Sequence, residues 1–156
     1  MPQSLSKLGV HLVFSTKGRA RVFPTPELRA DLCAYLAGIL RNQGCPCIQA
    51  GAVQDHVHIL YLQSRTKSVA DVVGAVKRDS SAWIKTQDCE RKDPALMKFH
   101  WQDGYGVFAV SESKIEAVKA YIDNQEEHHK RVSFQDEYRS FLQKHGVEFD
   151  ERYVWD

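Results

Sequence analysis

The stretch "CIQAGAVQDHVHILYLQ", residues 47–63, decides the fold that the sequence predicts. Residues 47–54 and 56–63 are two strand-like runs, and a single aspartate separates them. Two such runs with a tight connection are typical of a β-hairpin. The stretch therefore predicts two neighbouring antiparallel strands.

The second of these strands carries two histidines in a run that otherwise suits burial. Successive side chains of a strand point to opposite faces, so His56 and His58 share one face. The apolar residues Val57 and Ile59 point to the other face. Two imidazoles side by side could hold a metal ion and leave positions open for a substrate, which suits catalysis. They could equally be two polar residues on a solvated face, and spacing alone leaves both readings open.

Alternating apolar residues predict one more strand on each side of the hairpin. Residues 7–16 alternate between apolar and polar positions, and residues 105–111 do so again. This alternation is typical of a half-buried strand. The first of these strands is expected to place four apolar side chains on one face: Leu8, Val10, Leu12 and Phe14.

Three helices are predicted from their start signals and their apolar spacing. The N-cap residues and their partners are Thr25 before Pro26, Ser68 before Asp71, and Ser113 before Glu116. A threonine followed by proline fits the first turn of a helix, and serine with an acidic residue three positions later resembles a capping box. The first helix is expected to end at Gly44, since glycine favours the residue after a helix.

The predicted elements follow the order β-α-β-β-α-β-α. The first six match the split βαβ arrangement of ferredoxin-like proteins, an α+β sandwich in which two helices pack on one face of an antiparallel sheet. The last helix is additional and can lie against the open face. We expect residues 1–130 to form one domain and residues 131–156 to form an acidic tail packed on it or extending it.

Composition is that of a globular protein. The chain has 156 residues, of which 43% are hydrophobic and 26% charged, so it can bury a core as a single domain. No apolar run approaches the ~20 residues that span a bilayer, and the N-terminus lacks a signal-peptide layout, so we expect a cytoplasmic protein without membrane attachment. The cysteines lack the spacing of a zinc knuckle or redox pair and are expected to be reduced thiols. They are Cys33, Cys45, Cys47 and Cys89.

Charge is divided unevenly along the chain. Residues 1–100 carry a net charge of +6 and residues 101–156 a net charge of −5, although the whole chain carries only +1. A division of this kind is a weak indication of an anionic partner such as nucleic acid. An acidic tail that is simply a solvated surface explains it as well.

A second group of functional side chains lies in "YIDNQEEHH", residues 121–129. Tyr121 and Gln125 are four residues apart and share one face of the predicted last helix. If that helix covers the histidine face of the sheet, both side chains converge with His56 and His58. His128 and His129 follow directly; they could be extra ligands or proton carriers, and we favour surface or DNA-adjacent roles for them.

Four segments in this order resemble one enzyme family. They are "HLVFSTKGR", "HVHIL", "FHWQDGYGVFAVS" and "YIDNQEEHH". Together they are similar to the single-tyrosine transposases of the HUH class, the small IS200-like enzymes of insertion sequences that move as single-stranded DNA. The similarity runs from about Leu8 to His129, so residues 1–130 would be the catalytic domain.

The resemblance implies a ferredoxin-like dimer that binds single-stranded DNA with a hairpin and whose active site can be shared between chains. His56, His58 and Gln125 would hold Mg²⁺ or Mn²⁺, and Tyr121 would be the nucleophile. A tyrosine stores the energy of the phosphodiester as a phosphotyrosine, so DNA can be rejoined without ATP. A phenol with a pKa of about 10 leaves more readily than an alkyl alcohol, which makes the step reversible.

The basic first half then supplies candidate contacts to DNA phosphates: Lys17, Arg19, Arg21, Lys77 and Arg78. Trp101 and Tyr105 could stack on unpaired bases, and core packing explains each at least as well. Three other functions stay open: a domesticated relative that acts on repeated palindromic elements, a ferredoxin-like nucleic-acid-binding module without catalysis, and a metal-dependent hydrolase that uses water.

Overall fold

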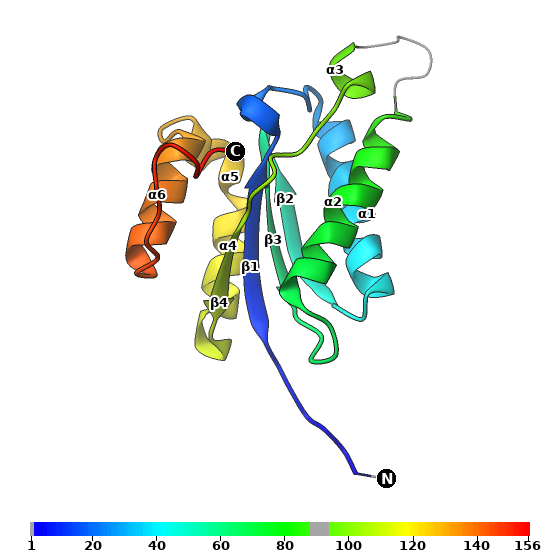
Figure 1. Ribbon diagram of the computed structural model, residues 1–156, viewed down its shortest axis with the longest axis vertical. Helices are drawn as coiled ribbons and strands as arrows, with labels where there is room; N and C mark the ends of the chain where they lie inside the picture. The colour runs from blue at the N-terminus through cyan, green and yellow to red at the C-terminus, as the bar shows by residue number, and fades with distance from the viewer. Residues whose placement is uncertain (1, 88–93) are drawn as a thin grey trace.

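A computed structural model describes residues 2–87 and 94–156. Its centre is a four-stranded antiparallel sheet with the strand order β2-β3-β1-β4 (Figure 1). The strands are β1 (Gly9–Ser15), β2 (Cys47–Ala52), β3 (His56–Leu62) and β4 (Gly106–Val110). This α+β arrangement is the ferredoxin-like topology that the order of elements predicts.

The helices that the structure describes are α1 (Pro26–Asn42), α2 (Val69–Ile84), α3 (Pro94–Met97), α4 (Ile115–Asp123), α5 (Gln125–His129) and α6 (Phe134–Lys144). Two short 3₁₀ turns span Lys17–Arg19 and Glu112–Lys114. Caps at Thr25 and Ser68 form as predicted, because each side chain accepts a hydrogen bond from a backbone amide three residues later. The capping box at Ser113 is wrong: this residue lies inside the second 3₁₀ turn and pairs with Ser111.

The main core lies between the sheet and helices α1 and α2, which cover the same face (Figure 1). It contains alternate residues of β1 and β3: Val10, Leu12, Phe14, Val57, Ile59 and Tyr61. Leu8 is an exception to the predicted stripe, since it precedes β1 and is 48% exposed. Cys33, Cys45 and Cys47 are free thiols, whereas Cys89 lies outside the described residues.

The opposite face of the sheet is covered by α4 and α6. Two separate apolar clusters hold these helices there. One contains Val13, Phe108, Phe134, Tyr138 and Leu142, and the other contains Leu60, Ile115 and Ile122. The segment 131–156 is therefore packed on the sheet through α6 rather than solvated along its whole length.

Two glycines let these helices approach the sheet closely. A Cβ atom on Gly51 would lie 2.8 Å from Ile122 Cγ2, and one on Gly106 would lie 2.5 Å from Tyr138 Cε2. Real Cβ atoms essentially never show contacts below 3.0 Å. The absence of a side chain at these two positions therefore determines how close α4 and α6 lie to β2 and β4.

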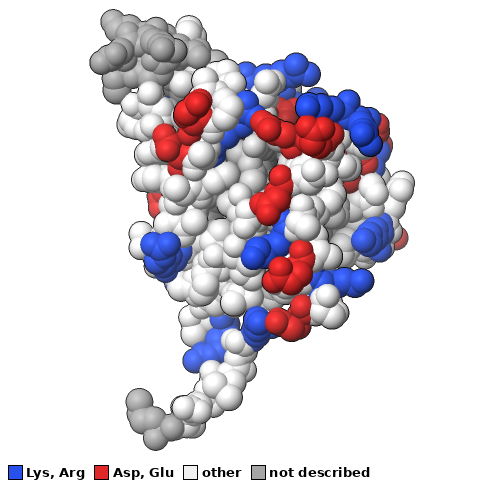
Figure 2. All heavy atoms as spheres, turned by 180° about the vertical axis from the view of Figure 1, so that it is seen from behind, with Lys and Arg blue, Asp and Glu red and all other residues white. Residues whose placement is uncertain are grey.

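Charged side chains are mixed over the surface. Figure 2 shows Asp and Glu side chains among Lys and Arg side chains on the face turned away from the viewer of Figure 1. The division of charge along the chain therefore does not appear on that face as a basic half and an acidic half. None of the described helices is long and apolar enough to span a membrane.

Candidate active site

The two histidines of β3 are buried on the face that α4 and α6 cover. His56 and His58 are each only 1% exposed. The pairing of β3 with β1 places His58 opposite Val13. Imidazole groups are rarely buried to this extent without polar partners. The partners in this structure come from helices far away in the sequence.

Helices α5 and α6 bring two more groups to the histidines. His129 Nε2 lies 2.9 Å from His56 Nε2. Glu137 Oε1 lies 2.8 Å from His58 Nε2 and 3.2 Å from His129 Nε2. One nitrogen or oxygen from each of these four residues lies within 4.8 Å of the others. We call His56, His58, His129 and Glu137 the histidine–glutamate cluster.

Hydrogen bonds behind two of the rings determine which nitrogen faces the cluster. His56 Nδ1 lies 2.7 Å from Asp55 Oδ1, and His129 Nδ1 lies 2.8 Å from the Val132 carbonyl oxygen. The carboxylate and the carbonyl are acceptors, so both Nδ1 atoms carry the hydrogen. Burial lowers the pKa of His56 to about 4, although the bond to Asp55 opposes this. His56 is therefore neutral at pH 7, and its Nε2 presents a lone pair to the cluster.

His11 of β1 stands behind the third ring. Its Nε2 lies 2.9 Å from His58 Nδ1. Burial, and next the neighbouring His58, lower the pKa of His11 to about 3, so His11 is neutral and able to accept a hydrogen bond. Metal-binding histidines commonly donate their second nitrogen to such a partner, which directs the first nitrogen toward the ion.

Glu137 is the only carboxylate of the cluster. Burial alone would raise its pKa, but hydrogen bonds with His129 and His58, together with the charge of His58, hold the pKa well below its usual range. Its side chain is 2% exposed. The carboxylate is therefore ionised at pH 7 and places a negative charge among the imidazoles.

Tyr121 of α4 reaches the same carboxylate. Its hydroxyl donates a hydrogen bond to Glu137 Oε2 and lies 3.3 Å from His128 Nε2. Its ring centroid is 5.8 Å from that of His58. Burial raises the pKa of Tyr121 well above its usual range, and the hydrogen bond and charge of Glu137 add to this, so the phenol is neutral at pH 7. A single chain thus brings its own tyrosine to its own histidines.

Gln125 opens α5 and is 3% exposed. Its Nε2 donates to the Tyr121 carbonyl oxygen at 3.3 Å, while its Oε1 is buried and is without a hydrogen-bond partner among the described residues. A buried unpaired acceptor costs about 1–3 kcal/mol, so this oxygen is suited to a cation. Imidazole nitrogens, a carboxylate and an amide oxygen are a donor set that fits a divalent ion.

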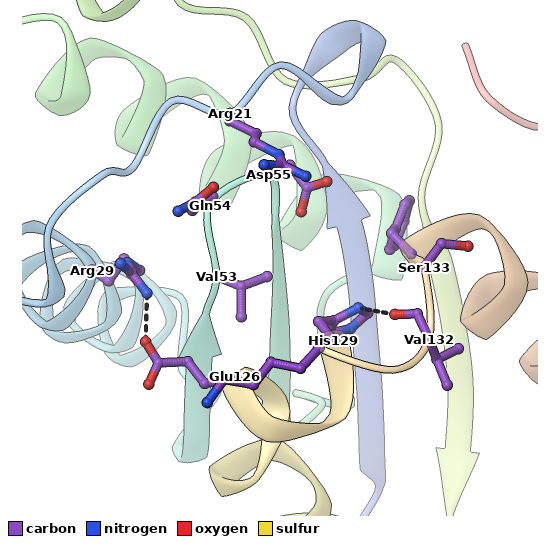
Figure 3. Close-up of a pocket in the computed structure, with 11 residues that line it drawn as sticks. Arg21, Arg29, Val53, Gln54, Asp55, Glu126, His129, Val132 and Ser133 are labelled. Carbon is purple, nitrogen blue, oxygen red and sulfur yellow. Dashed lines mark hydrogen bonds and ion pairs between the residues drawn. The ribbon is translucent and has the colours of Figure 1, made fainter.

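The predicted DNA contacts occupy different environments. Lys17 is exposed and Arg19 half-buried on the first 3₁₀ turn, where Arg19 lies 5.8 Å from the Trp155 ring. Arg78 is exposed on α2. Arg21 lines a cavity of about 630 Å³ together with Asp55 and His129, so among these residues it is placed beside the cluster. Figure 3 shows Arg21 and Asp55 at one end of this cavity and His129 toward the other.

Lys77 holds backbone carbonyl oxygens instead of facing solvent freely. Its ammonium donates to the carbonyl oxygens of Gln102, Asp103 and Gly104 at 2.7, 3.1 and 2.7 Å. An ammonium has three hydrogens, so the backbone takes all of its donors. Burial lowers its pKa to about 8. Lys77 fastens the segment before β4, and this geometry gives the predicted phosphate contact no support.

The two aromatic residues considered for stacking on bases also lie in different environments. Trp101 is 5% exposed in the main core, and its Nε1 donates to Ser80 Oγ at 2.9 Å, so core packing accounts for it. Tyr105 is 37% exposed and lies 5.4 Å from the Lys77 ammonium.

A second cavity, of about 810 Å³, is lined by Tyr121 and Glu137 and by aromatic side chains that include Phe108 and Phe141.

The sequence interpretation missed Glu137 and favoured a surface or DNA-adjacent role for His129. One signal was available for Glu137. Phe134, Tyr138 and Phe141 form an apolar stripe at helical spacing, and Glu137 lies three residues after the first and four before the last. An acidic residue inside a buried stripe requires partners, which here are the histidines.

Comparison with known proteins now identifies the family. The family described as "Transposase IS200 like" matches residues 4–125. The chain belongs to this family of transposases. His56, His58, Tyr121 and Gln125 fall inside the matched range, whereas His129 and Glu137 lie beyond it.

Two solved structures resemble this IS200-like transposase. A candidate transposase from Deinococcus radiodurans R1 shares 27% of its residues, with a TM-score of 0.62 over 80% of this chain and 95% of that chain. A REP-associated tyrosine transposase bound to a REP hairpin shares 11% of its residues, with a TM-score of 0.58 over 85% of this chain and 74% of that chain. The second likeness concerns the fold alone. No curated protein matches the chain.

Proposed function

We propose that this IS200-like transposase is a metal-dependent enzyme that cuts and rejoins single-stranded DNA through a 5′-phosphotyrosine on Tyr121. The observation that carries the proposal is the meeting of the Tyr121 hydroxyl with the carboxylate that contacts His58 and His129. A nucleic-acid-binding module has no need to bring a tyrosine, three histidines and a buried glutamate into contact in one place.

Tyr121, Glu137 and water account for the protons and for the exchange of bonds. In cleavage, Tyr121 Oη bonds to phosphorus and the bond from phosphorus to O3′ breaks, which leaves a 3′-hydroxyl once O3′ takes a proton from water. Because the phenol is neutral at pH 7, its proton must leave as it attacks. Glu137 Oε2 is the acceptor already in contact. In joining, a DNA 3′-hydroxyl releases its proton to water and bonds to phosphorus, the bond from phosphorus to Tyr121 Oη breaks, and Tyr121 Oη takes back the proton from Glu137.

His56, His58 and Gln125 would hold the divalent ion, Mg²⁺ or Mn²⁺, as the family resemblance implies. When bound, the ion supplies charge stabilisation for the scissile phosphate. Burial keeps His56 neutral and therefore able to bind a cation at pH 7. The buried, unpaired Oε1 of Gln125 supports its inclusion.

The proposed partner is single-stranded DNA with a hairpin, which the hairpin-bound relative of similar fold supports. Lys17, Arg19, Arg21 and Arg78 remain candidate phosphate contacts, and Arg21 is the one beside the cluster. We also propose a homodimer. The contact of Tyr121 with the cluster of its own chain supports an active site built in each chain rather than one shared between two.

The test is a covalent adduct assay on single-stranded DNA that contains a hairpin. With Mg²⁺ or Mn²⁺, wild type should form an adduct that survives denaturing electrophoresis, and Tyr121→Phe should form none. Tyr35→Phe is the matched control, because Tyr35 is 39% exposed and stacks on Trp83. An adduct in Tyr121→Phe would show that the nucleophile is another residue. DNA cleavage that persists without any adduct would instead favour a hydrolase that uses water.

A further inference from the structure

We propose that His129 and Glu137, which lie beyond the family match, are ligands of the same ion as His56 and His58. The inference rests on the metal site of the proposed function and extends it beyond residue 125, where the family match ends. It assigns α6 to the catalytic centre and makes the segment after residue 130 part of the metal site.

The first support is the position of hydrogens between two rings. Nδ1 of His56 and Nδ1 of His129 both carry their hydrogen, because each faces an acceptor oxygen. These bonds turn the Nε2 atoms of both rings toward the cluster, where they face each other at 2.9 Å. Both nitrogens therefore point at the space that a cation between or beside them would occupy. A divalent ion there would bind both rings at once.

The second support is that every histidine ring of the cluster has a hydrogen-bond partner on its outer side. Each of the three rings has a partner on the side away from the cluster: Asp55 behind His56, the Val132 carbonyl behind His129, and His11 behind His58. This arrangement is typical of histidines that bind metals, where the outer partner selects the tautomer and the ring orientation.

The third support is that the two oxygens of the Glu137 carboxylate contact different groups. Oε1 faces His58 and His129, whereas Oε2 accepts the hydrogen bond from the Tyr121 hydroxyl. One oxygen can therefore bind the ion while the other holds the nucleophile beside it. A ligand from α6 would in this way couple the position of Tyr121 to the presence of the metal.

The ligand set also narrows the choice of ion. Three imidazole nitrogens beside the oxygens of Glu137 and Gln125 suit a transition-metal ion better than Mg²⁺, which prefers oxygen ligands and keeps several waters. We therefore expect Mn²⁺ to bind the DNA-free protein at least tenfold more tightly than Mg²⁺.

The test is isothermal titration of the full-length, metal-free protein with Mn²⁺ in the absence of DNA. Glu137→Gln keeps the size of the side chain and should weaken Mn²⁺ binding at least tenfold, and His129→Gln should do the same. Glu148→Gln is the matched control, because Glu148 is exposed in the same C-terminal segment, and its affinity should stay within twofold of wild type. Melting curves in EDTA show whether each variant is folded.

A second measurement needs no variant. Pulsed electron paramagnetic resonance of Mn²⁺ bound to wild type counts the coupled imidazoles, and three are expected. Two would overturn the role of His129. Unchanged or tighter Mn²⁺ binding by Glu137→Gln would overturn the role of Glu137, since its carboxylate would then only fill the place of the ion. Wild type that binds no Mn²⁺ would overturn the metal dependence of the proposed function itself.

Discussion

Replacement of Gly51 by alanine should separate the tyrosine helix from the sheet. Gly51 lies in β2 opposite His58, and a Cβ atom there would be 2.8 Å from Ile122 Cγ2 and 3.0 Å from the Ile122 carbonyl oxygen. The carbonyl belongs to the backbone of α4 and cannot rotate away. Ordinary contacts begin at 3.4 Å, so α4 must shift by several tenths of an ångström. Tyr121, the preceding residue, moves with it.

Two magnitudes follow from this shift. Overpacking of a tight contact costs about 1–3 kcal/mol. For a chain of this size, each kcal/mol lowers the melting temperature by about 2–4 °C. A misplacement of about 1 Å in a reacting group can cost roughly 100-fold in rate, so a shift of several tenths should slow adduct formation about tenfold.

The assay is single-turnover adduct formation on the hairpin-bearing DNA, with a melting curve of each protein. Gly38→Ala is the matched control, because Gly38 lies inside α1 and a Cβ atom there meets nothing within 4 Å. Alanine should stabilise that helix by about 0.5–1 kcal/mol and leave the adduct rate unchanged. The reasoning is refuted if Gly51→Ala melts and reacts like wild type.

Two further predictions concern stability. Lys77→Met should lower the melting temperature by several degrees, because three carbonyl oxygens lose their hydrogen-bond donor. The control Arg78→Met should leave the melting temperature unchanged. Similar melting of both variants would contradict the role of Lys77 in fastening the segment before β4. The folded-state pKa values of His11 and His56 are about 3 and 4 against an ordinary 6.5, so the unfolded chain binds more protons below pH 6.5. The unfolding free energy of metal-free protein should therefore fall as the pH drops from 6.5 toward 4, by up to about 1.4 kcal/mol per pH unit for each histidine. Melting curves in EDTA should show a shallower fall for His11→Gln than for the exposed control His100→Gln, and equal slopes would refute the assignment.

The elements that the sequence predicts best are those that repeat a local pattern. Period-two alternation locates β1 and β3, and the N-caps at Thr25 and Ser68 locate α1 and α2. The alternation of β3 also indicates that His56 and His58 share a face. Local rules fail at Ser113, where a 3₁₀ turn takes the place of the expected cap.

The partners of the site residues cannot be predicted in the same way, because they depend on how distant segments pack. Lys77 is of a residue type that commonly contacts phosphates, yet its ammonium binds the backbone before β4. Glu137 is an acidic residue in a segment that looks like a solvated tail, yet it lies on the face of α6 that is buried against the sheet. In both cases burial changes the chemistry of a charged group, and burial follows from tertiary packing rather than from local sequence.

The position of Glu137 near the end of the chain has a consequence for how the protein is made. Chains emerge from the ribosome N-terminus first, and domains begin to fold in that order. The strands and the helices before α6 are synthesised before Glu137, whose contacts with His58, His129 and Tyr121 close the site. Until α6 has been synthesised, the chain lacks both the Glu137 carboxylate and the apolar side chains that cover Val13 and Phe108 of the sheet. Translation that stops before α6 would therefore release a chain whose active centre cannot close.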